Sequence, residues 1–245
     1  MEEKIIPVRT LGMLNLPDCC PRCFWLILRS EGKFPFQIPM PGIFSSIDGY
    51  SKNLIHTYFD SQKVLPSWFP NIGKVVGYLP GYKLHWSKFK TAHPETRIVL
   101  RGTPDDVFSL DDGSYHIVDY KTAKATEKQD ELFPAYEVQL NVYAFIGASR
   151  GFSPVSGLSL VYMEPKTEIN GKAVGELIQK DFFSLRFSAT LKKVQLTAEK
   201  LVPDLLVRAR KILDCATPPK GRDHCKDCEL LLQLLRTTQA GGITI

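Results

Sequence analysis

The stretch that decides the fold is GTPDDVFSLDDGSYHIVDYK, residues 102–121. Two apolar and β-branched runs, at 107–110 and 115–121, flank the turn Asp111-Asp112-Gly113. An Asp-Gly pair between such runs is typical of a β-hairpin. The stretch therefore predicts two neighbouring antiparallel strands whose polar ends lie close together.

The polar ends of this hairpin carry candidate catalytic side chains. Asp119 and Lys121 are two residues apart on a strand, so both point to one face. The hairpin returns them beside Asp105 and Asp106. Carboxylates near a lysine could form a simple ion pair, but they also suit a hard cation such as Mg²⁺ or Mn²⁺, with the Tyr120 carbonyl as a further ligand. The lysine could then orient or deprotonate water, as metal-assisted phosphodiester hydrolysis requires.

The helix expected after this hairpin, at 135–149, carries a second polar pair. Gln139 and Tyr143 are four residues apart and project together from one side of the helix. Alone they would be read as an ordinary polar helix face. Next to the strand carboxylates, a glutamine could hydrogen-bond the lysine or a metal-bound water, and a tyrosine could contact substrate.

Working outward, the periodicity alternates between helices and strands. Further helices are expected at about 45–60, 201–215 and 225–235, and further strands at 97–101, 157–163 and 181–187. This order predicts an α/β fold with a central mixed β-sheet flanked by helices.

Composition sets the outer limits. The 245 residues are 44% hydrophobic and 23% charged, with a net charge of +5, which excludes a disordered chain, a collagen and a coiled coil. The longest apolar run, 24–28, is too short to cross a bilayer, and residues 1–10 hold no apolar signal-peptide core. A cytoplasmic protein with no membrane partner is therefore expected.

The six cysteines fall in two groups near the chain ends. Cys20 and Cys23 form one C-x2-C pair, and Cys225 and Cys228 form another. Four thiolates could bind Zn²⁺ or a [4Fe–4S] cluster, while the plain alternative is free buried cysteines. A set of Cys20 or Cys23 with Cys215, Cys225 and Cys228 is the other grouping left open.

Three motifs in order resemble the PD-(D/E)XK nuclease superfamily, in its RecB-like exonuclease branch. They are Gly102-x-x-Asp105, Asp119-x-Lys121 and Gln139-x3-Tyr143. The resemblance implies one domain over 1–245, with a restriction-endonuclease-like core at about 45–190. Terminal helices within 1–30 and 200–236 would carry the cysteine pairs, as in CRISPR-associated RecB-like nucleases, and this similarity favours the iron–sulfur cluster.

The resemblance also implies roles for single residues. Asp105, rather than Asp106, and Asp119 would hold Mg²⁺ or Mn²⁺, and Lys121 would position or activate the water. Gln139 would orient Lys121, and Tyr143 would contact substrate. His56 is the candidate for the metal-binding histidine that this branch often carries on an upstream helix.

The implied activity is a DNA exonuclease, as in DNA repair, acting on a free end or a single strand. A helicase, or a recombination or CRISPR protein, is the kind of partner implied. The alternatives are a non-catalytic nucleic-acid-binding or assembly module of the same fold, and a nuclease that acts on RNA.

Overall fold

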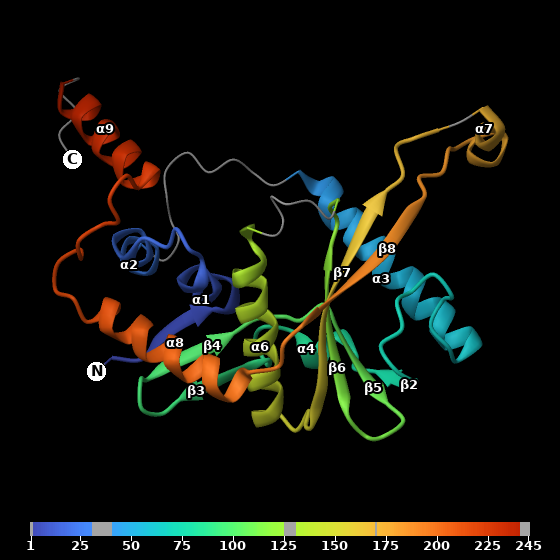
Figure 1. Cartoon of the computed structure of the whole chain (residues 1–245), viewed down its shortest axis with the longest axis horizontal. Helices are drawn as coiled ribbons and strands as arrows, with labels where there is room; N and C mark the ends of the chain where they lie inside the picture. The colour runs from blue at the N-terminus through green and yellow to red at the C-terminus, as the bar shows by residue number, and fades with distance from the viewer. Residues whose placement is uncertain (1, 31–40, 125–130, 170, 241–245) are drawn as a thin grey trace.

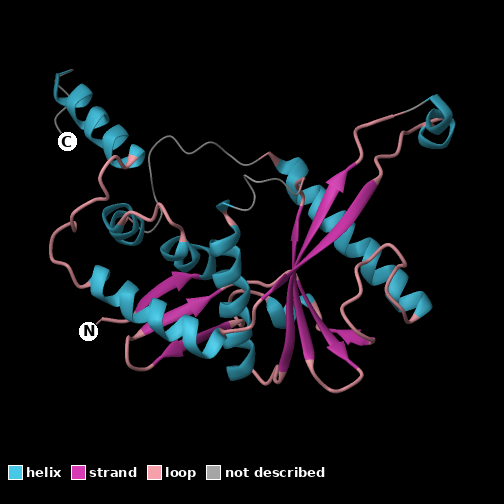
Figure 2. Ribbon diagram, in the orientation of Figure 1, coloured by secondary structure: helices cyan, strands magenta, loops and turns pink. Residues whose placement is uncertain are grey.

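The computed structural model describes residues 2–30, 41–124, 131–169 and 171–240. Its strands form two mixed sheets, one of five strands in the order β2-β5-β6-β7-β8 and one of three in the order β1-β4-β3 (Figures 1 and 2). The elements are β1 (Lys4–Pro7), α1 (Val8–Gly12), η1 (Met13–Asn15), α2 (Pro21–Arg29), α3 (Gly42–Gln62), β2 (Val75–Tyr78), α4 (Gly81–Leu84), β3 (Lys90–His93), β4 (Ile98–Arg101), β5 (Asp106–Leu110), β6 (Tyr115–Lys121), α6 (Phe133–Ser149), β7 (Val155–Pro165), α7 (Gly171–Leu177), β8 (Phe187–Val194), α8 (Ala198–Leu213) and α9 (Lys226–Ala240).

The predicted hairpin is confirmed as β5–β6. The two strands pair antiparallel, with Asp106 opposite Val118. Gly113 has a φ of 82°, which glycine adopts without strain, and Asp112 Oδ1 accepts the Ser114 backbone N–H at 2.9 Å. The turn thus sets the register that brings Asp105, just before β5, beside the end of β6.

Helix α6 makes the crossover between the parallel strands β6 and β7. It packs on both of these strands and also contacts β3 and β4, so it lies between the two sheets (Figure 1). Its buried positions include Val138, Val142 and Ile146. Behind it, α8 closes the larger hydrophobic core with Val202 and Leu206.

Helix α3 covers the opposite face of the five-stranded sheet. Ile55 and Phe59 pack there in a second core with Phe108, Val118 and Tyr120. The end of β6 therefore lies between α6 on one face of the sheet and α3 on the other. Side chains from β6 itself, from α6 and from α3 can meet there.

The predicted α/β class, with mixed sheet flanked by helices, is confirmed. The expected strand at 181–187 is wrong, because β8 begins at Phe187 and pairs along its whole length with β7. Phe182 and Phe183, within that span, are exposed. They follow α7, which lies at the far end of the β7–β8 arm (Figure 1). No helix among the described residues is long and apolar enough to span a bilayer.

Candidate active site and cysteine centre

Tyr120 binds the neighbouring residues Asp105 and Asp106 through two different groups. Its backbone N–H donates to Asp105 Oδ2 at 2.8 Å, and its hydroxyl donates to Asp106 Oδ2 at 2.7 Å. Asp106 is only 1% exposed and points into the core around Tyr120. Asp105 is thus the neighbour that turns toward the end of β6.

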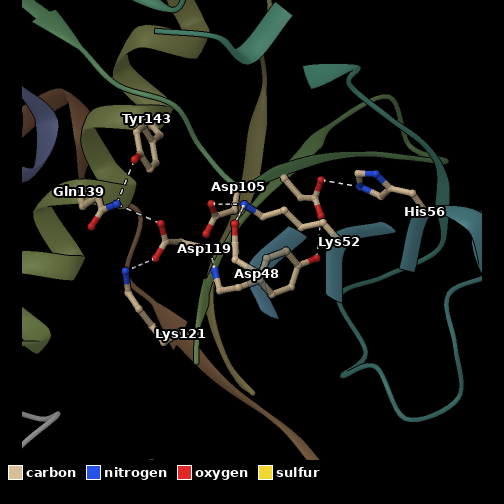
Figure 3. A network of polar contacts seen from close by, with 10 residues as sticks. Asp48, Lys52, His56, Asp105, Asp119, Lys121, Gln139 and Tyr143 are labelled. Carbon is tan, nitrogen blue, oxygen red and sulfur yellow. Dashed lines mark hydrogen bonds and ion pairs between the residues drawn. The ribbon is translucent and has the colours of Figure 1, made fainter. Parts of the chain in front are cut away.

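His56 lies on the Asp106 side of this arrangement. Its Nε2 donates to Asp106 Oδ1 at 2.7 Å, and its ring stacks on Tyr78 with 4.0 Å between centroids. The structure therefore places the predicted metal-binding histidine against Asp106, not beside Asp119 (Figure 3).

Asp119, on β6, points toward α6. It is 3% exposed, and its Oδ1 accepts the Gln139 side-chain N–H at 3.0 Å. Its Oδ2 lies 2.5 Å from Lys121 Nζ but accepts no hydrogen bond of regular geometry. Lys121 Nζ also lies 4.2 Å from the centre of the Tyr136 ring. Gln139 was expected to orient Lys121; the structure places its side chain on Asp119, which in turn pairs with Lys121.

Tyr143 supports the site from the core. It is 4% exposed, and its hydroxyl accepts the Gln139 side-chain N–H at 3.0 Å. A Cβ at Gly102 would lie 2.7 Å from Tyr143 Cε1 and 2.6 Å from Val8 Cγ2, so a glycine is needed where the ring packs. The expected direct contact of Tyr143 with substrate does not fit this burial, and the side chain braces Gln139 instead.

Helix α3 adds two site residues that the sequence reasoning missed. Lys52 Nζ lies 2.7 Å from Asp105 Oδ1 and 2.7 Å from Asp48 Oδ2 (Figure 3). A signal was present, since Asp48, Lys52 and His56 are spaced by four and share one face of α3. The spacing becomes informative only in the structure, where Lys52 contacts Asp105 and His56 contacts Asp106.

Burial raises the pKa values of the two site carboxylates, Asp105 and Asp119. Burial, followed by the nearby charge of Asp119, raises the pKa of Asp105 to about 7, although Lys52 opposes this. Burial likewise raises the pKa of Asp119, although Lys121 opposes it. Burial alone would lower the pKa of Lys52, but the charges of Asp105 and Asp48 outweigh it and raise that pKa.

The residues at this position fit a hard divalent cation. Carboxylate oxygens are the ligands that Mg²⁺ and Mn²⁺ prefer. The buried Asp119 Oδ2 is paired in this structure with the Lys121 amine, a positive partner whose place a dication could share. Two buried carboxylates with raised pKa values would both ionise more readily beside a bound dication.

The four predicted cysteines form one group, which confirms the two-plus-two arrangement. The Sγ atoms of Cys20, Cys23, Cys225 and Cys228 all lie within 4.8 Å of one another. Cys215 stands apart and directs its Sγ to the Lys211 carbonyl at 3.5 Å. The group lies at the start of α2 and the start of α9, which are close in space (Figure 1), and its contacts join residues 202 to 208 positions apart in the sequence.

The sequence matches a known protein family over most of its length. The family model of the PD-(D/E)XK nuclease superfamily matches residues 63–231, more than half of the chain. A solved structure described as "Crystal structure of SSO0001" is similar at a TM-score of 0.40, with 14% identity over 89% of this chain and 81% of that one. No curated protein matches in sequence. On the extent of the family match, the chain belongs to the PD-(D/E)XK nuclease superfamily.

Proposed function

We propose that the protein is a divalent-metal-dependent DNA nuclease of the RecB-like branch, with Asp105, Asp119 and Lys121 at its centre. The observation that carries this proposal is the convergence of the three motifs at the end of β6. Asp105 is held by the backbone of Tyr120, and Asp119 contacts both Lys121 and Gln139. Side chains from separate positions in the chain thus meet where phosphodiester chemistry would need them.

Asp105 and Asp119 would hold Mg²⁺ or Mn²⁺, with the Tyr120 carbonyl as a further ligand. Such an ion, when bound, supplies positive charge against the phosphate and lowers the pKa of a coordinated water. His56 would act one step away, because it holds Asp106, which in turn holds the Tyr120 hydroxyl. The Tyr120 backbone then positions Asp105.

Lys121 is the group proposed to position or deprotonate the attacking water. Its Nζ is fixed between Asp119 and the face of Tyr136, so it begins close to the metal-binding carboxylate. Gln139 holds the other Asp119 oxygen, which fixes the orientation of the carboxylate between the glutamine and the lysine. Pre-set geometry of this kind lowers the barrier because little rearrangement is needed during reaction.

Lys52 is proposed as a second cation at the same centre. It already bridges Asp48 and Asp105, with its amine 2.7 Å from each carboxylate. Once the carboxylates bind a dication, Lys52 is released from part of this pairing and can contact a DNA phosphate. Asp48 is then left one helical turn from Lys52, where it can keep the amine near the site.

The substrate proposed is DNA with a free end or a single-stranded segment, and the reaction proposed is exonucleolytic. A helicase, or a recombination or CRISPR protein, would supply such ends. The four cysteines are proposed to hold a separate metal centre that joins the two ends of the chain.

The decisive experiment incubates the protein and Mn²⁺ with end-labelled single-stranded, duplex and closed circular DNA, and with RNA of the same sequence. Asp119→Asn is the test variant, and Asp111→Asn, in the exposed hairpin turn, is the matched control. Cleavage of linear but not circular DNA that Asp119→Asn abolishes and Asp111→Asn keeps is the expected result. Cleavage of RNA alone would show that the substrate is RNA and not DNA. Binding without cleavage would favour the non-catalytic module.

A further inference from the structure

The cysteine group is too compact for the iron–sulfur cluster that the family resemblance implies. Three Sγ pairs lie 3.6 Å apart, namely Cys20–Cys228, Cys23–Cys225 and Cys23–Cys228. Every Sγ–Sγ distance in the group is within 4.8 Å. These distances can be compared with what each type of centre demands.

A single tetrahedral ion sets a short distance between sulfurs. With Zn–S bonds of about 2.3 Å, neighbouring thiolates lie about 3.8 Å apart. A [4Fe–4S] cluster binds each thiolate to a different iron at an outer corner, so its four cysteine sulfurs lie about 6 Å apart or more. The distances in this protein match the single ion and leave no room for a cubane between the sulfurs.

The backbone around the sulfurs is also built for close approach. A Cβ at Gly221 would lie 3.2 Å from Cys228 Sγ, so glycine lets the second segment pass against the sulfur. The backbone N–H of Arg222 donates to Cys20 Sγ at 3.3 Å, a contact that stabilises a thiolate. The backbone at Gly221 and Arg222 therefore lies directly against the sulfurs and limits the space between them.

Two reciprocal arginine contacts join the two segments that carry the cysteines. Arg22, between Cys20 and Cys23, donates its Nε–H to the Pro219 carbonyl at 3.1 Å. Arg222, ahead of Cys225, donates its Nε–H to the Asp18 carbonyl at 3.0 Å. Each cysteine segment thus binds the backbone of the other.

We infer that Cys20, Cys23, Cys225 and Cys228 bind one Zn²⁺ ion as a closed structural site, and not an iron–sulfur cluster. All four positions are filled by protein ligands, which is typical of structural rather than catalytic zinc. Zinc has no redox chemistry in proteins, so the ion would fasten α2 to α9 without passing electrons. This inference rests on the cysteine geometry alone and holds whether or not the chain cleaves DNA.

The test is metal analysis of full-length protein produced with both iron and zinc supplied and purified without oxygen. About one zinc and no stoichiometric iron per chain is expected, with no broad absorption near about 400 nm. Replacing zinc with Co²⁺ should give the intense visible bands of a tetrahedral thiolate complex. About four irons per chain with the broad absorption, or full-length protein that is folded and binds neither metal, would overturn the inference.

Variants separate this centre from the other cysteines. Cys225→Ser and Cys20→Ser should each reduce zinc content at least tenfold, whereas Cys19→Ser and Cys215→Ser should leave it unchanged. Asp119→Asn, which tests the nuclease proposal, should keep its zinc. Loss of zinc in Cys215→Ser but not in Cys20→Ser would show that the ligand set is wrong, independently of any result on DNA cleavage.

Discussion

The backbone N–H of Tyr120 donates to Asp105 Oδ2 at 2.8 Å, and this contact links the strand that carries Asp119 to the residue just before β5. The Tyr120 side chain extends to the other face of the sheet and holds Asp106. One residue thereby assigns two adjacent aspartates to different tasks. Asp105 faces the candidate metal site, and Asp106 stabilises the core beneath it.

This division predicts opposite phenotypes for the two aspartates. Asp105→Ala should reduce Mn²⁺-dependent DNA cleavage by about a hundredfold or more, because it removes a metal-binding carboxylate. Asp106→Ala should slow cleavage by the folded protein by less than about tenfold, because the Tyr120 N–H still holds Asp105. It should lower the free energy of unfolding by about 2–4 kcal/mol, because it leaves Tyr120 and His56 without a buried acceptor. Cleavage assays and urea unfolding of both variants measure the contrast. Loss of cleavage in folded Asp106→Ala, with Asp105→Ala active, would reverse the assignment.

Lys121→Met should act on turnover rather than on DNA binding. The substitution keeps an apolar stem of similar length against Tyr136 and removes the amine beside Asp119. Turnover should fall by about a hundredfold, as for a lost acid–base or electrostatic group. DNA affinity, measured in Ca²⁺, should change by less than about threefold. A loss confined to affinity would make Lys121 a phosphate contact only.

Tyr143→Phe tests whether the tyrosine braces the site from inside. The ring stays packed against Gly102, and only the hydroxyl that accepts the Gln139 N–H is removed. We expect cleavage to slow by about three- to tenfold with the affinity for DNA unchanged, because Gln139 loses one of its two partners. Gln139→Leu removes the Asp119 contact itself and should slow cleavage more. A large loss of DNA affinity in Tyr143→Phe would instead restore the direct substrate contact.

The local parts of the site could be predicted from the sequence because their signals are local. Strand alternation and an Asp-Gly turn fix β5, β6 and the common face of Asp119 and Lys121. The two C-x2-C pairs were equally readable, since their spacing and isolation near the chain ends left few groupings.

The missed parts depend on contacts between distant segments. Lys52 joins the site across 53 residues, and nothing in helix periodicity says which strand end it approaches. The second sheet depends on the parallel pairing of β1 with β4, from Lys4 opposite Ile98 onward. The misplaced strand at 181–187 failed for another reason, because its apolar residues are exposed on an arm and are not part of a core.

His116 predicts how the fold responds to acid. The residue is 8% exposed, its Nε2 lies 2.9 Å from Ser159 Oγ, and a Cβ at Gly157 would clash with its Nδ1. Burial, followed by the charge of Lys193, lowers the pKa of His116 from 6.5 to about 4. Between these values the unfolded chain binds the proton and the folded chain does not, so the contribution of His116 to stability is complete above pH 6.5 and declines as the pH falls toward 4.

The contribution of His116 to this decline should reach about 3 kcal/mol near pH 4. His116→Gln should remove that part of the pH dependence, so its free energy of unfolding should fall less steeply than that of the wild type between pH 7 and 4. Ser159→Ala is the matched control, because it removes the hydrogen-bond partner while the imidazole stays buried, and it should lower stability at pH 7 but keep the wild-type slope. Urea unfolding at half-unit pH steps measures all three curves. Parallel curves for His116→Gln and the wild type would show that His116 does not contribute to the acid sensitivity of this fold.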